Sequence, residues 1–81
     1  MLHARPDYNR IQDPLREIPQ DEPVFLLRGQ DVAAPQVVEM WALLAHDAGA
    51  KDDIVQAAYE QAQAMRIWQF EHGSKVPDMP E

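Results

Sequence analysis

Apolar residues in the second half of the chain recur at the spacing of an amphipathic helix. A first helix is predicted from Asp31, whose side chain suits the N-cap, to about Ala48. Pro35 falls within the first turn, where its missing N–H does no harm, and Gly49 supplies the C-terminal stop. One stripe of this helix is apolar, and its members are Val37, Trp41, Leu44 and Ala48, flanked by Met40 and Ala45.

The next helix is predicted to begin at Asp52 as its cap and to continue to about His72, before Gly73. The linker is short, so the two helices should form an antiparallel hairpin. The stripe expected to face the first helix contains Ile54, Ala58, Ala62, Met65 and Trp68. A second apolar line contains Val55, Tyr59 and Phe70. Because one hairpin cannot cover both lines, the pattern favours self-association.

Residues 23–28 form a short apolar run between Pro23 and Gly29. Such a run is typical of a buried strand or of one helical turn, and its valine and phenylalanine favour the strand. A lone strand would leave backbone groups unpaired. Its expected partner is therefore either the segment around Tyr8–Gln12 or the same strand of another subunit.

Prolines in the first third of the chain exclude a continuous helix there. We predict an extended arm over residues 1–22, with a short turn near Asp13–Ile18, and a loose tail over residues 74–81. Between them, residues 23–73 form the strand and the hairpin of a single small domain. The fold class is mainly α, with an arm and one short strand before an antiparallel two-helix hairpin completed by homo-oligomerisation.

Composition narrows the function classes. The chain has 81 residues and no cysteine, which excludes disulfides and thiolate metal sites. Its net charge of −7 disfavours direct binding to DNA, RNA or anionic membranes. No apolar run could span a bilayer and no signal peptide is recognisable, so the cytoplasm is the expected compartment. Residues 29–81 hold three basic residues against nine acids, a balance of −6.

No catalytic or metal motif is recognisable. Ser74 is the only serine and lies in the tail, and the three histidines match no metal signature. Glu39 and His46 could pair on one helix face, although a solvated face is the favoured explanation of both. Three acids between residues 47 and 53 suit helix capping better than a cation site. We therefore expect no enzyme activity, no cofactor and no metal.

The segment from Arg28 to Asp31 is the strongest candidate for ligand binding. An arginine beside a helix N-terminus suits a phosphate or carboxylate, although the Asp31 carboxylate competes for the same N–H donors. Arg10 and Tyr8 would complete the site, with Gln30 beside them and the indole of Trp41 or Trp68 as a stacking surface. The alternatives are that Arg28 pairs with Asp21, Glu22 or an acid of the second helix, and that both indoles belong to the core.

Residues 18–50 resemble small uncharacterised proteins of bacteriophage and bacterial genomes. The shared pattern in this chain is Asp21–Phe25, Arg28, Gln30-Asp31, Ala34-Pro35 and Trp41. The resemblance implies a phage or prophage accessory protein, and phages often encode small oligomeric proteins that neutralise host defences.

Two functions follow from these features. The first is a non-enzymatic oligomer that sequesters a small anionic ligand, such as a nucleotide immune signal, through Arg28, Arg10 and Tyr8. The alternative is an acidic inhibitor or adaptor that meets a basic surface on a host protein.

Overall fold

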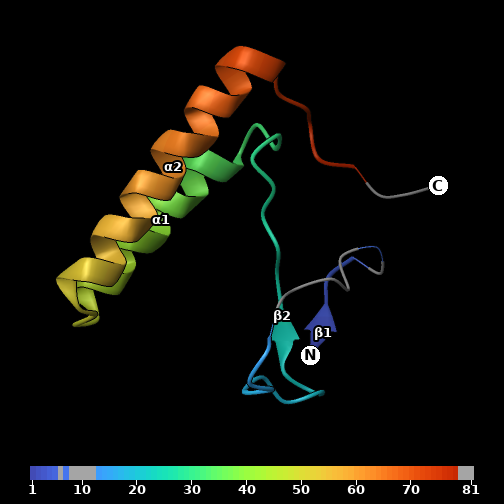
Figure 1. Cartoon of the computed structure of the whole chain (residues 1–81), viewed down its shortest axis with the longest axis vertical. Helices are drawn as coiled ribbons and strands as arrows, with labels where there is room; N and C mark the ends of the chain where they lie inside the picture. The colour runs from blue at the N-terminus through green and yellow to red at the C-terminus, as the bar shows by residue number, and fades with distance from the viewer. Residues whose placement is uncertain (6, 8–12, 79–81) are drawn as a thin grey trace. The chain divides into compact units, whose positions relative to one another are not determined.

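The computed structural model describes residues 1–5, 7 and 13–78 (Figure 1). Its elements in chain order are β1 (Leu2–His3), β2 (Pro23–Val24), α1 (Ala34–Asp47) and α2 (Asp52–His72). The chain divides into two compact units, residues 1–27 with Asp78 and residues 28–77. The protein is mainly helical, as expected.

The second unit is built on the predicted helical hairpin. Figure 1 shows α1 and α2 running side by side, joined at one end by a short turn. Gly49 has a φ of 91°. Its N–H donates to the His46 carbonyl at 3.0 Å, and the Ala50 N–H donates to the Ala45 carbonyl at 2.9 Å. This pair of bonds is a Schellman motif, which requires a residue with positive φ. The stop predicted at Gly49 is confirmed.

The predicted helix starts are wrong by a few residues. The Asp31 carboxylate accepts the N–H of Ala33 at 2.8 Å, and the Asp31 carbonyl accepts that of Ala34 at 3.0 Å. These bonds close a tight turn ahead of α1, so the helix begins at Ala34 and Ala33 occupies the N-cap. Asp52 is the first residue inside α2, and Lys51 stands at its N-cap without a side-chain bond.

The core of the hairpin is small. Its buried apolar residues are Ala34, Ala42, Val55, Ala62 and Met65, with Pro35 also buried in α1. Ala42 and Ala62 are completely covered, at 0% exposure. The two helices therefore pack mainly through alanines, and no large side chain of the described chain is fully buried.

The expected inner stripe of α1 is wrong. Trp41 is 53% exposed and Leu44 59%, and Val37 and Met40 also lie outside the core. On α2, the inner positions Ala58, Ala62 and Met65 are confirmed as buried or half-buried, whereas Ile54 and Trp68 are exposed. In the second line, Val55 is buried but Tyr59 and Phe70 are exposed. The alanines let the backbones approach closely, so the larger side chains remain outside.

The first unit contains a two-stranded parallel sheet. Leu2 pairs with Pro23 and His3 with Val24. The predicted strand over residues 23–28 is therefore limited to Pro23–Val24, and its partner is Leu2–His3 of the same chain. The other expected partner, the segment around Tyr8–Gln12, lies outside the described residues. This pairing gives β2 a partner in the same chain and removes that argument for an oligomer.

The turn expected near Asp13–Ile18 is present. The Asp13 carboxylate accepts the backbone N–H groups of Glu17 at 3.0 Å and Ile18 at 3.1 Å. Arg16 lies within the turn with a φ of 52°. An aspartate that bonds the backbone ahead of it is a common way to hold such a turn.

The chain after α2 is tied back to the loop that precedes α1. Gly73 ends α2 with a φ of 91°, as predicted. The Lys75 N–H then bonds to the Gln30 carbonyl at 2.7 Å, and the Lys75 carbonyl accepts the N–H of Val32 at 3.0 Å. The tail expected from Ser74 onward is thus held at Lys75 by backbone bonds.

Candidate functional site

The predicted ligand-binding residues fall in different parts of the chain. Tyr8 and Arg10 lie outside the described residues. Arg28 and Gln30 lie in the loop before α1, and Trp41 lies on α1 itself. Seven residues separate Trp41 from the first residue of α1, which is about 10 Å along a helix axis. The indole is therefore set well along the helix from the loop.

The loop before α1 is held by a side chain from the other helix. The Gln69 amide donates hydrogen bonds to the carbonyls of Gly29 and Asp31, both at 2.8 Å. The N–H of Asp31 bonds to the Arg28 carbonyl at 3.0 Å. Residues 28–31 therefore form a turn that is hydrogen-bonded to α2.

The N-terminus of α1 has few donors to offer an anion. The Asp31 carboxylate already occupies the N–H of Ala33, and the Asp31 carbonyl occupies that of Ala34. Pro35 has no N–H. Arg28 is exposed, and none of the described acids of α2 forms an ion pair with it. Its guanidinium is accessible, but the helix end beside it already carries a carboxylate.

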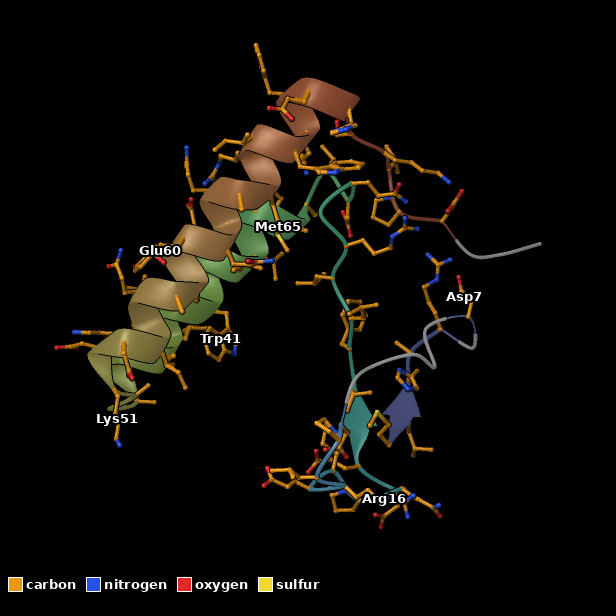
Figure 2. All side chains as sticks on the ribbon, in the orientation of Figure 1. Asp7, Arg16, Trp41, Lys51, Glu60 and Met65 are labelled. Carbon is orange, nitrogen blue, oxygen red and sulfur yellow. The ribbon has the colours of Figure 1, made fainter. Side chains whose placement is uncertain are left out.

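The two tryptophans lie on the outside of the hairpin. Figure 2 shows the Trp41 ring projecting away from the ribbon of the two helices. Trp68 is 41% exposed and stacks on His72, with ring centroids 4.4 Å apart and an interplanar angle of 18°. The expectation that both indoles belong to the core is therefore wrong for the described chain.

A continuous apolar side of the hairpin was not predicted as a single surface. Counted at 100° per residue from the buried positions, one side of the hairpin collects these residues of α1 and α2: Val37, Trp41, Leu44, Ala48, Ile54, Ala57, Gln61, Ala64 and Trp68. All of them are exposed. We call this surface the tryptophan face. The sequence signal was the excess of apolar stripes over what one hairpin can cover.

The other side of the hairpin carries an ion pair beside the exposed apolar residues Leu43, Tyr59 and Phe70. Arg66 of α2 donates a hydrogen bond to Glu39 of α1 and forms an ion pair with it. This bond lowers the pKa of Glu39 from its ordinary value, against a smaller opposing effect of desolvation. The possible pair of Glu39 with His46 is not formed. The Nδ1 of His46 lies instead 3.6 Å from the Oδ1 of Asp47.

The acids near the hairpin turn form no metal site. Among the described residues, no group of three or more histidine, cysteine, aspartate or glutamate side chains lies close enough to hold a metal ion. The Asp53 carboxylate accepts the N–H of Ile54 at 2.8 Å, within the first turn of α2. This carboxylate therefore serves the helix start, where negative charge is favourable.

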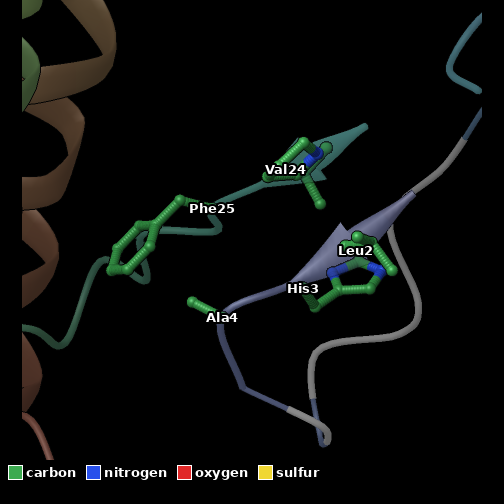
Figure 3. Close-up of a pocket in the computed structure, with 6 residues that line it drawn as sticks. Leu2, His3, Ala4, Val24 and Phe25 are labelled. Atoms are coloured by element: carbon green, nitrogen blue, oxygen red, sulfur yellow. The ribbon is translucent and has the colours of Figure 1, made fainter. Parts of the chain in front are cut away.

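The first unit contains a shallow pocket beside its two strands (Figure 3). Its volume is about 390 Å³, and it is lined by Leu2, His3, Ala4, Pro23, Val24 and Phe25. The lining is mainly apolar. The buried Nδ1 of His3 has no hydrogen-bond partner among the described residues. The pocket is open to solvent and brings no second titratable side chain to His3.

In comparisons with known proteins, no family model, curated protein or solved structure matches this chain. No helix among the described residues is long and apolar enough to cross a membrane. The function is therefore argued from the surfaces of the hairpin.

Proposed function

We propose that this protein is a non-enzymatic binding protein that acts through protein–protein contact, as an acidic inhibitor or adaptor whose fold is completed by homo-oligomerisation. The observation that carries this proposal is that the hairpin leaves its large apolar side chains outside its own core. Trp41, Leu44 and Ile54 are all more than half exposed, whereas alanines fill the space between the helices. Apolar surface gathered on one side of a small protein commonly marks a contact with another chain.

The small core supports the same proposal. The α1 helix has 14 residues and α2 has 21, lengths at which helices in water depend on packing for their stability. Inside the hairpin, Val55 and Met65 are the largest buried side chains. A partner that covers the outer apolar residues would add burial that the single chain does not provide.

The charge of the hairpin indicates the chemistry of the partner. Residues 29–81 carry a balance of −6, and exposed acids such as Glu60 and Glu71 lie on the outer edge of α2, beside the tryptophan face. Such a surface attracts a basic partner and speeds its encounter. The resemblance to phage and bacterial proteins suggests that this partner is a bacterial host protein.

A capture experiment followed by a binding measurement tests the proposal. Immobilised protein is exposed to bacterial extract, and retained proteins are identified by mass spectrometry. Each is then purified and its affinity is measured at low and high salt against the wild type and the Glu60→Gln/Glu71→Gln variant. Gln63→Ala, which changes an exposed uncharged residue of the same helix, is the matched control.

We expect at least one purified partner whose affinity falls as salt rises and falls again in the charge-neutralised variant, but not in the control. An extract that yields no direct partner would reject the proposal. A partner whose affinity is insensitive to both salt and the two acids would reject its electrostatic part.

Sequestration of a small anionic ligand is the second candidate. It is supported by the exposed Arg28 guanidinium and the exposed indole of Trp41. It is opposed by the Asp31 carboxylate, which occupies a donor at the start of α1. Native mass spectrometry with a panel of nucleotides tests it directly. A releasable adduct that is lost in Arg28→Glu supports it, and the absence of any adduct rejects it.

A further inference from the structure

The tryptophan face is free of charge, which is unusual on a chain with a net charge of −7. None of its nine residues is acidic or basic. The charged residues lie outside this face: Glu39 and Arg66 are on the opposite side of the hairpin, and Glu60 and Glu71 are at the outer edge of α2. Two copies of an acidic chain can approach through this face without bringing like charges together, and interface cores are generally depleted of charge.

The exposed area of this face supplies a large part of what a dimer requires. From their exposed fractions and ordinary side-chain areas, its five large residues leave about 500 Å² of apolar surface uncovered. The alanines and Gln61 between them add to this area. Stable interfaces bury about 800 Å² on each partner, so the face accounts for most of one half of such an interface.

The face is also complementary to itself. In its centre α1 contributes large residues, Trp41 and Leu44, whereas α2 contributes the smaller Ala57, Gln61 and Ala64. A two-fold axis that lies in the plane of the face, parallel to the helices, places α1 of one copy over α2 of the other. Each large side chain then meets a position with a small one, which is the condition for an isologous contact.

We propose that the tryptophan face binds a second copy of this chain, giving a two-fold symmetric dimer in which two hairpins form a four-helix bundle. The proposal deepens the proposed function, on which it rests, by naming the face and the number of copies. The acidic sides of α2 remain outside the bundle, where a basic partner can reach them. In such a bundle the two indoles become part of a core that the single hairpin lacks.

The mass of the full chain in solution is the first test. Light scattering or native mass spectrometry should give twice the 9.3 kDa of the single chain. Trp41→Glu places a charge at the centre of the face and should shift the mass to that of the monomer. Phe70→Glu is the matched control, because Phe70 is 93% exposed and lies on the other side of α2. That variant should remain dimeric.

Cysteine cross-linking gives a second test that does not require a stable monomer. The chain has no cysteine, so Gln61→Cys and Gln63→Cys each introduce a single thiol on α2. Gln61 lies on the tryptophan face and Gln63 lies on the side of Arg66. Because the proposed packing sets α2 of one copy against α1 of the other, each variant is mixed with Leu44→Cys of α1. Under mild oxidation, Gln61→Cys should form covalent dimers with Leu44→Cys faster than Gln63→Cys does, by roughly tenfold or more. Circular dichroism checks that both variants are helical.

A monomeric wild type at the concentrations of the capture experiment would overturn the dimer. So would a dimer that persists in Trp41→Glu with equal cross-linking at the two cysteine positions, because it would place the interface elsewhere. A relocated interface leaves the proposed function unchanged, whereas a monomeric wild type removes the homo-oligomerisation from it. Its adaptor part is tested separately and fails only if no basic partner binds directly. A dimer that binds no other protein would in turn support the inference and reject the adaptor.

Discussion

Arg66 of α2 forms an ion pair with Glu39 of α1 across the hairpin, joining residues 27 apart in the sequence. The bond that Arg66 donates lowers the pKa of Glu39 and raises that of the guanidinium itself. It lies on the side of the helix pair away from the tryptophan face. Both side chains are partly exposed, so solvent and salt weaken the interaction.

This pair predicts a defined pH dependence of stability. Because the pKa of Glu39 is lower in the folded chain, its contribution is complete above the ordinary value of 4.5 and is lost as the pH falls through the lowered pKa. At neutral pH, the thermal unfolding midpoint of Glu39→Gln should therefore be slightly lower than that of the wild type. The difference should vanish in acid, and should shrink at high salt.

Glu71→Gln is the control for that measurement, since it removes the same charge from an exposed position of α2. An unfolding difference for Glu39→Gln that does not change between neutral pH and acid would contradict the assignment of the ion pair.

Gln69 predicts a larger loss of stability. Its amide bonds two part-buried carbonyls of the loop before α1, and Gln69→Ala leaves both without that donor. The expected cost is about 1–3 kcal/mol in the free energy of unfolding. Gln69→Glu should cost more, because a carboxylate would face two carbonyl oxygens. Denaturant unfolding measures both, with Gln63→Ala as the neutral reference on the same helix.

Substitution by alanine should affect stability differently at two of the glycines. Gly49 has a φ of 91° with open space around it, so a side chain is opposed only by backbone strain. Gly49→Ala should destabilise the hairpin by about 1–2 kcal/mol. At Gly29 an added Cβ would lie 3.8 Å from the Met65 side chain, an ordinary contact. Gly29→Ala should therefore change the unfolding midpoint little, and equal losses at both sites would contradict this account.

The alanine contact between the helices predicts a steric effect. Ala62 is completely buried, so Ala62→Leu forces the helices apart or strains the new side chain. The expected cost is about 1–3 kcal/mol. Gln63→Leu adds a leucine at the neighbouring exposed position and should be close to neutral. If Ala62→Leu is equally well tolerated, the helices do not pack as closely as described.

Local rules predicted the hairpin well. Gly49 and Gly73 end their helices where the sequence indicated, because only glycine adopts their positive φ without strain. The short turn near Asp13–Ile18 was also expected, and the Asp13 carboxylate holds it. Asp31 misled the prediction of the helix start, since the same carboxylate can close a turn ahead of a helix as readily as it can cap one.

The candidate site was less predictable. The sequence singled out Arg28, Gln30 and Trp41. The Gln69 side chain that holds the loop of Arg28 and Gln30 comes from about 40 residues away and has no local signal. The pairing of Leu2–His3 with Pro23–Val24 was also missed, because strands of two residues are too short for a period to be recognised.

The sequence by itself determined the two helices, their C-terminal ends and the excess of apolar residues, since these depend on neighbouring residues and on a period of 3.6. Only the tertiary structure decided which stripe lies inside. Hydrophobicity favours burial of Trp41 and Leu44, but close approach of two backbones selects Ala42 and Ala62. Which stripe is buried depends on the shape of the opposite helix. Because the alanine stripe is buried, the largest apolar side chains remain on the outer surface.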